Sequence, residues 1–158
     1  VSQYLQRELP EYNLDSSRIK HIPETHVQMA PPEHFIFSSK IPGFIHPGSS
    51  TSIQIQEVEG TNYVMIDRVM TEEHFESQDV ELISREEVTT NTGYDGVIYT
   101  VRFEVKGVKY ERMMLFAGDY NNTMWINANY PIVSKKLVYE PVRNSILSAS
   151  LTENKSHE

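Results

Sequence analysis

Residues 97–117 carry an alternation of apolar and polar side chains that constrains the fold more than any other part of the chain. The alternation runs through 97–105 and again through 108–117, with Lys106 and Gly107 between the two runs. A period of two is typical of a β-strand, because successive side chains point to opposite faces. Two such runs joined by two residues that include glycine indicate a tight β-hairpin.

The two-residue turn fixes the pairing register of this hairpin. It brings two pairs of opposite charge face to face. These pairs are Arg102 with Glu111 and Glu104 with Lys109. A slip of one residue would break both pairs and turn the apolar residues to the opposite face of the sheet. The charges therefore support the register that the turn predicts.

The second face of the hairpin is charged near the turn but apolar at its far end, at Ile98, Met113 and Leu115. A sheet with one solvated face would be polar there throughout, so both faces need a cover. We expect that cover from helices in 61–77 and 131–148. The predicted fold class is α+β, a central antiparallel sheet flanked by helices on both faces.

The other expected strands are short, and they are separated by Pro-Gly, Asn or Asp turns. We expect Thr61–Ser77 to form one helix with a break or two short ones, with Thr61 or Asn62 as the first cap and Thr71 opening a second set of turns. In the strand that follows, Val80, Leu82 and Val88 are expected on one side. The other strands are expected around Val27–Met29, Phe35–Phe37, Ile53–Ile55 and Thr123–Asn129.

The last helix is expected to begin at Pro131, since proline is tolerated in a first helical turn. Ile132, Val133 and Leu137 form its first apolar stripe, and Pro141 is expected to kink or restart it. Val142, Ile146, Leu147 and Ala149 continue the stripe.

Three segments follow from these patterns. Residues 1–25 are expected to be an N-terminal tether or a marginal helix, 26–151 a single folded domain, and 152–158 a frayed tail. With 158 residues, of which 39% are hydrophobic, the chain is long enough for one core.

Composition excludes several classes of function. The chain has no cysteine, so disulfides, thiolate metal sites and thiol catalysis are excluded. It has 14 Lys and Arg against 22 Asp and Glu, a net charge of −8, which opposes binding to nucleic acid. No apolar run is long enough for a membrane helix.

No catalytic or metal-binding motif is present. The six histidines include no pair at the i, i+4 spacing of a zinc-binding helix. Glu33-His34 and Glu72-Glu73-His74 put carboxylates beside imidazoles, but neighbouring residues point in different directions. There is also no nucleophile elbow and no glycine-rich phosphate loop. We therefore expect no enzyme activity, no metal and no cofactor.

A binding loop is the remaining candidate. Phe44, Ile45 and His46 lie between two turn sequences, Pro42-Gly43 and Pro47-Gly48. Such turns restrict the loop, so it would lose little conformational entropy when it binds a partner. The alternative is that Phe44 folds inward and caps the core. Tyr94 and Tyr120, both near turns, are candidates for the same binding surface.

The order of elements and several short stretches resemble a known superfamily. The stretches are 27–35 (VQMAPPEHF), Gly43-Phe44, 52–55 (SIQI) followed by Glu57, 84–88 (SREEV), and 128–131 (ANYP) leading into the final helix. From Thr25 to Leu151 the chain resembles the PsbP-like α/β/α sandwich superfamily, closest to uncharacterised bacterial members. The resemblance implies a central antiparallel sheet flanked by helices, and it implies no shared active site.

The preferred interpretation is a noncatalytic accessory or binding domain of the bacterial cell envelope, whose partner is an unidentified protein or small ligand. Because the chain starts with Val1 rather than methionine, we expect a leader to have been removed and the protein to be periplasmic or lipid-anchored. A truncated chain would begin in the same way, and a cytosolic location is the alternative. The alternative is a small hydrolase or metal-dependent enzyme, whose residues would be brought together only by the fold. That alternative requires at least two of His34, His46, His74 and the carboxylates to converge in one pocket with perturbed ionisation.

Overall fold

The predicted hairpin lies at the centre of the fold. The computed structural model describes residues 19–153. Strands β7 (Asp95–Val105) and β8 (Val108–Gly118) pair in the predicted register throughout. Lys106 and Gly107 have φ angles of 50° and 82°, both in the left-handed region that a two-residue hairpin turn of this type requires. The hairpin prediction is confirmed.

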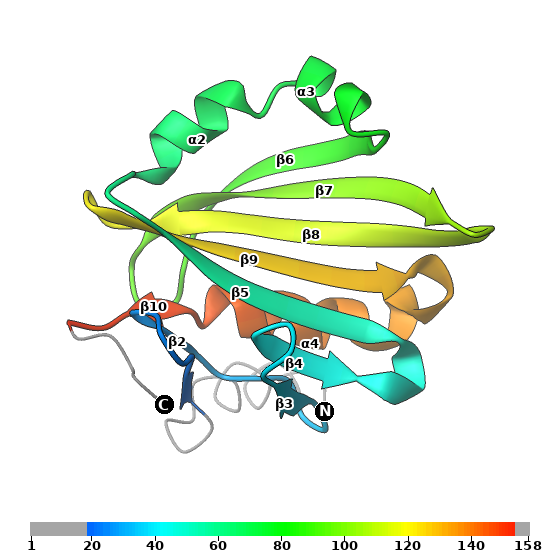
Figure 1. The fold of residues 1–158 in the computed structure, drawn as a ribbon, viewed down its shortest axis with the longest axis horizontal. Coiled ribbons are helices and arrows are strands. Elements are labelled where there is room, and N and C mark those ends of the chain that lie inside the picture. The colour runs from blue at the N-terminus through cyan, green and yellow to red at the C-terminus, as the bar shows by residue number, and fades with distance from the viewer. Residues whose placement is uncertain (1–18, 154–158) are drawn as a thin grey trace, which may run out of the picture.

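The hairpin belongs to a seven-stranded antiparallel sheet (Figure 1). Every neighbouring pair of strands in it is antiparallel. In sheet order the strands are β3 (Ile36–Ser38), β4 (Gly43–His46), β5 (Thr51–Glu59), β9 (Asn122–Pro131), β8, β7 and β6 (Glu81–Thr89). The pairing of β5 with β9 joins the N-terminal strands to the hairpin and completes the sheet.

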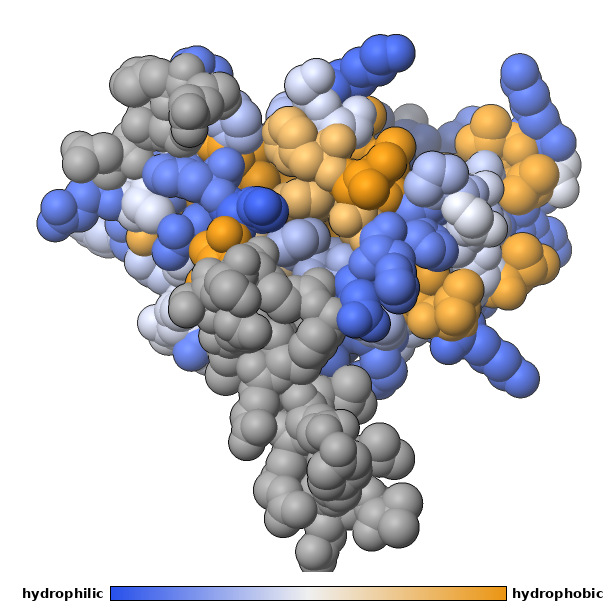
Figure 2. Space-filling model, turned by 90° about the horizontal axis from the view of Figure 1, so that it is seen from below, coloured by the Kyte–Doolittle hydropathy of each residue, from blue (hydrophilic) through white to orange (hydrophobic). Residues whose placement is uncertain are grey.

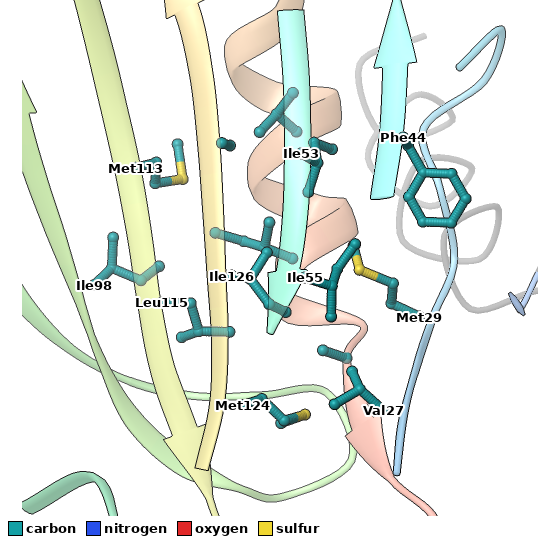
Figure 3. Close-up of a cluster of buried hydrophobic side chains, with 14 of the residues drawn as sticks. Val27, Met29, Phe44, Ile53, Ile55, Ile98, Met113, Leu115, Met124 and Ile126 are labelled. Carbon is teal, nitrogen blue, oxygen red and sulfur yellow. The ribbon is translucent and has the colours of Figure 1, made fainter. Parts of the chain in front are cut away.

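Helices cover both faces of the sheet (Figure 1). On one face, α2 (Tyr63–Val69) and α3 (Glu72–Ser77) pack over a core that includes Phe75 and Tyr99. On the other face, α4 (Lys135–Leu147) covers a larger core, part of which is shown in Figure 3. Ile98 and Leu115 in this second core are 2% and 0% exposed. The predicted α+β architecture, with a cover on each face, is therefore confirmed.

Residues 61–77 form two short helices, one of the two forms expected for this segment. The Asn62 side chain accepts hydrogen bonds from the amides of Val64 and Met65 at the start of α2. Thr71 accepts one from the amide of His74 at the start of α3. Each cap satisfies amides that have no partner inside the helix, so two helices begin within one short segment.

Strand β6 differs from the prediction because it contains a β-bulge. The pairing with β7 shifts between Leu82 and Ser84. An extra residue in one strand reverses the faces of the residues beyond it. Val80 and Leu82 therefore pack in the core under α2 and α3, whereas Val88 packs in the core under α4. The expectation that all three share one side was wrong.

The start of the last helix also differs from expectation. Pro131 is the last residue of β9 rather than the first of a helix, and a short 3-10 helix, η3 (Ile132–Ser134), separates it from α4. Pro141 lies inside α4 without ending it. The buried face of α4 consists of Val138, Val142, Ser145 and Ile146. Val133 and Leu137, expected in the apolar stripe, are 93% and 66% exposed.

The two ends of the described segment meet in a second, smaller sheet. It consists of β1 (Lys20–His21), β2 (Val27–Met29) and β10 (Ser150–Leu151). Ile22 is fully buried, so the folded part begins upstream of residue 26, where the domain was expected to start. Residues 1–18 of the expected tether, and 154–158 of the expected tail, lie outside the described residues.

Glu57 anchors this small sheet to the large one. Its carboxylate accepts a hydrogen bond from the backbone amide of His26 at 3.0 Å and lies 2.7 Å from His26 Nδ1. The amide of the Asn122 side chain donates to the same carboxylate.

Between residues 19 and 153, no helix is long and apolar enough to cross a membrane.

Candidate binding cleft

A cleft opens between the loop before β3, the end of β4 and the exposed side of α4. Its volume is about 290 Å³. The loop leaves β2 through Pro31-Pro32, which cannot donate backbone hydrogen bonds to a continuing strand. His34 follows in the left-handed region, with φ of 72°, and turns the chain into β3. The lining residues are Pro32, Glu33, His34, Phe35, His46, Leu137, Val138, Glu140, Pro141 and Asn144.

Phe35 and His46 form one wall of the cleft. Their rings stack with centroids 5.1 Å apart and planes inclined by 18°. The Nδ1 atom of His46 lies 2.7 Å from Ser49 Oγ, within hydrogen-bond distance. Ser49 follows in the short helix η2 (Pro47–Ser49) and also contacts Thr51 Oγ1 at 2.8 Å. These contacts hold the His46 ring in one orientation against Phe35.

Helix α4 forms the opposite wall. Val138 is 3% exposed and lies deep in the cleft, whereas Leu137 lies at its rim. Proline at 141 has no amide hydrogen and adds an apolar ring to the same wall. Figure 2, which views the molecule from below Figure 1, shows hydrophobic residues gathered near the middle of the face, with hydrophilic residues around them. The cleft thus has apolar walls and a polar rim.

The ionisable groups of the cleft lie mainly at this rim. His34 Nε2 and Glu33 Oε1 are 3.7 Å apart, and both side chains are largely exposed. Glu140 lies across the opening on α4. Within the described part of the chain, no group of three or more His, Asp or Glu side chains is placed to hold a metal ion.

The structure separates the residues proposed from the sequence for a binding surface. Phe44 is 1% exposed, so it folds inward and caps the core. Ile45 is half-buried next to it, and His46 lines the cleft. His46 pairs with Thr51 at the start of β5, whose far end, Glu59, pairs with Asn122.

Tyr94 and Tyr120 lie at that far end of the sheet. The pairing of Asp95 with Gly118 places both tyrosines there. Tyr94 packs against the core and its hydroxyl donates to the Leu151 carbonyl, while Tyr120 is 86% exposed. The five proposed residues therefore do not form one surface.

The sequence suggested His34 as the neighbour of Glu33 and, with His46 and His74, as a possible pocket residue of an enzyme, and it predicted Leu137 in an apolar stripe. Their place beside His46 depends on the packing of α4 against the loop before β3. The only sequence signal for this cleft is the Pro-rich loop at 31–32, which marks an interruption but not its partner.

Two clusters of ionisable groups with shifted pKa values lie outside the cleft. In the first, Arg85 donates to both carboxylate oxygens of Asp67 on α2, at 3.0 and 2.6 Å, and the Tyr99 hydroxyl donates to the same carboxylate. The hydrogen bond from Arg85 is the largest influence and lowers the pKa of Asp67, although burial opposes it. Burial, with help from Asp67, raises the pKa of Tyr99 to about 12. This cluster holds α2 onto the sheet.

The second cluster surrounds Glu111, whose side chain is 0% exposed. Arg102 Nε and Lys135 Nζ lie 3.1 and 3.2 Å from its Oε1 atom, and the Tyr130 hydroxyl donates to Oε2. Burial raises the pKa of Glu111, but the three donors together outweigh burial and lower it. This cluster joins β7, β8, β9 and the start of α4.

No protein-family model and no curated protein matches the chain. Solved structures do resemble it. A protein from Bacteroides thetaiotaomicron VPI-5482 has a TM-score of 0.58 and 15% identity over 87% of this chain and 49% of its own. The present chain therefore spans about half the length of that protein.

Two further structures match over most of both chains. LpqN of Mycobacterium tuberculosis, described as involved in cell envelope biogenesis, has a TM-score of 0.63 and 9% identity over 80% of this chain and 83% of its own. The cyanobacterial PsbP protein (CyanoP) of Synechocystis sp. PCC 6803 has a TM-score of 0.60 and 8% identity over 84% and 91%. Identities this low establish only the architecture. The antiparallel sheet with helices on both faces, together with these likenesses, shows that the protein has a PsbP-like fold.

Proposed function

We propose that this protein is a noncatalytic binding domain of the bacterial cell envelope. We propose further that its cleft between the loop before β3 and α4 takes up a small apolar group, either a free ligand or a side chain of a partner protein. LpqN, with a similar fold, is described as involved in cell envelope biogenesis, which supports an envelope location and an extracytoplasmic protein.

The cleft itself is the observation that carries the proposal. Binding sites for small molecules are concave, mostly apolar, and carry a few polar groups that fix orientation. Here Phe35, Val138 and Pro141 supply apolar walls, and His34 and His46 supply polar atoms near the opening. A cavity of about 290 Å³ suits a single ring or a branched aliphatic group.

A titration with indole, followed by amide chemical shifts, tests the proposal. We expect the largest shifts at residues 32–35, at His46 and at 137–141. Leu137→Ala should weaken indole binding about three-fold or more, because it removes apolar contact area at the rim. Val133→Ala is the matched control, since Val133 is also an exposed aliphatic residue at the start of the same helical segment but does not line the cleft. Shifts spread over the whole surface, or equal effects of the two variants, would contradict the proposal.

The alternative, a small hydrolase or metal-dependent enzyme, draws on one specific observation. His34 and His46 line the same cleft, together with Glu33 and Glu140. An assay of p-nitrophenyl acetate hydrolysis, with and without added zinc, separates the two functions. Turnover above that of free imidazole, lost in both His34→Ala and His46→Ala, would favour the enzyme. Unchanged background rates in both variants would favour the binding domain.

A further inference from the structure

A second hollow lies on the opposite face of the sheet, beside α3. Helix α2 packs on β7 and β8, and α3 packs on β6, so these two short helices leave part of the face uncovered (Figure 1). The groove has a volume of about 590 Å³. Its lining residues are Met70, His74, Phe75, Gln78, Asp79, Val80, Val101, Phe103, Glu104, Arg112, Met114 and Trp125. None of them lines the cleft beside α4.

The sheet side of this groove is a platform of large apolar side chains. Trp125 is half-buried, and its ring stacks on Phe116 with centroids 5.6 Å apart. Its Nε1 atom donates to Asn127 Oδ1 at 3.0 Å. Met114 and Phe103 lie on neighbouring strands of the same face. The ring stacking and the hydrogen bond fix the orientation of Trp125, so its ring offers a rigid surface to a ligand.

Arg112 is the unusual residue of the groove. Its Nε atom donates to Asn129 Oδ1 at 2.6 Å, and its Cζ atom lies 4.8 Å from the centre of the Phe103 ring. These contacts hold the guanidinium in place. No carboxylate among residues 19–153 forms an ion pair with it, and its two terminal nitrogens have no hydrogen-bond acceptor in that part of the chain.

Other half-buried arginines in the described part of the chain do have carboxylate partners. Arg102 pairs with Glu111, and Arg143 forms a two-pronged pair with Glu86 at 3.0 and 2.8 Å. Burial without a partner lowers the pKa of Arg112, but arginine stays charged in proteins. In a chain of net charge −8, a held guanidinium with free donors in a groove is complementary to an anion from outside.

The remaining ionisable residues of the groove limit the charge of that anion. Asp79 and Glu104 line it from α3's end and from β7, and His74 lines it from α3. Because side chains alternate along β7, Glu104 points to the opposite face of the sheet from Phe103 and Arg112. Asp79 is then the lining carboxylate on the groove side, and its charge disfavours a ligand with several negative charges. A ligand with one negative charge and an apolar or flat body satisfies both Arg112 and the Trp125 platform.

We propose that this groove binds a small monocarboxylate carried on a ring, with the carboxylate on the terminal nitrogens of Arg112 and the ring against Trp125 and Met114. The ring can be a sugar, as in a uronic acid, or aromatic. Both share the chemistry that the groove recognises. This binding site is separate from the cleft of the proposed function, and neither depends on the other.

Trp125 is the only tryptophan in the chain, so its fluorescence reports directly on the groove. The full chain is titrated with D-galacturonate and with phenylacetate, which distinguish the sugar acid from the aromatic acid. Phenylacetamide is the neutral counterpart of phenylacetate. We expect a saturable change in Trp125 fluorescence with at least one of the two acids, and at least ten-fold weaker binding of phenylacetamide than of phenylacetate if the aromatic acid is the ligand.

Variants locate the binding. Arg112→Gln should weaken acid binding at least ten-fold, and Arg112→Lys should weaken it less, because it keeps the charge but loses the two-pronged geometry. Arg68→Gln is the control, since Arg68 is exposed on α2 and does not line the groove.

Far-ultraviolet circular dichroism and the unfolding midpoint check that each variant is folded. The comparison of phenylacetate with phenylacetamide on the unaltered chain keeps the test valid even if Arg112→Gln does not fold. The proposal is overturned if neither acid changes Trp125 fluorescence, if phenylacetate binds but phenylacetamide binds equally well, or if folded Arg112→Lys and Arg68→Gln bind alike.

Discussion

At the scale of single residues, Glu111 is a fully buried carboxylate with three side-chain donors. A fully buried carboxylate is unfavourable unless charged donors surround it. Arg102, Lys135 and Tyr130 supply those donors from three different elements. The sequence predicted Arg102 opposite Glu111 as a cross-strand pair worth a few tenths of a kcal/mol. It did not reveal Lys135 or Tyr130, because those contacts depend on how β9 and the start of α4 pack.

Replacing Glu111 by Gln should lower the free energy of unfolding by about 2 kcal/mol at pH 7, because Arg102 and Lys135 lose their shared carboxylate. Both cations remain partly exposed, which keeps the loss below that of a fully buried pair. Glu104→Gln is the control, because Glu104 is exposed on the same strand pair, and it should change stability by less than about 0.5 kcal/mol. Urea unfolding measures both. Equal effects would show that the Glu111 cluster does not stabilise the fold.

At the scale of elements, the sequence predicted the turns and helix caps more accurately than the buried faces of the helices. Asn62, Thr71 and the turn at 106–107 act through backbone groups two or three residues away, so the local sequence contains the information. The bulge in β6 and the extension of β9 to Pro131 could not be predicted in this way. They depend on which strand lies alongside, and no local pattern marks Ile83 as the extra residue.

Gly107→Ala tests the hairpin turn. At φ of 82° a Cβ atom strains the backbone although nothing lies within 4 Å of it, and the variant should lose about 1 kcal/mol of stability. Gly48→Ala is the matched control. Its φ lies outside the left-handed region and its nearest contact, His46 Cε1, would be an ordinary 3.7 Å away. Thermal unfolding of the two variants should therefore differ, with only Gly107→Ala shifted to lower temperature.

At the scale of the whole molecule, the sheet separates two independent cores. Phe75 and Tyr99 belong to the core under α2 and α3, and Ile98 and Leu115 belong to the core under α4. Each face also has its own carboxylate cluster, Asp67 on the first and Glu111 on the second. Hydrophobic alternation in β7 and β8 predicted both cores, because a period of two assigns each residue to a face.

Stability should fall in acid through both clusters. The pKa values of Asp67 and Glu111 are lowered from ordinary values of 3.8 and 4.5. A lowered pKa means that the folded state holds the proton less tightly than the unfolded state does. Their stabilisation is therefore present above about pH 4.5 and lost as pH falls through the lower folded values.

The double variant Asp67→Asn, Glu111→Gln should lose less stability between pH 5 and pH 3, roughly the range in which these groups titrate, than the unaltered chain does. Because the two sites lie on opposite faces, the single effects should add to within about 0.5 kcal/mol. Urea midpoints measured across this range test both statements. An acid response identical to that of the unaltered chain would show that other groups control it.

The sequence by itself determined the hairpin register, one broken helix or two short helices in 61–77, the need for a cover on each face, and through these the α+β architecture. All of these follow from alternation, turns and caps, whose partners are near in sequence or are set by the period of a strand. The tertiary structure alone decided that Phe44 turns inward, that His34 and Leu137 meet His46 in a cleft, and that Arg112 has no carboxylate partner among residues 19–153. Such sites depend on contacts between segments far apart in the chain, and sequence periodicity specifies a residue's face but not the segment that packs against it.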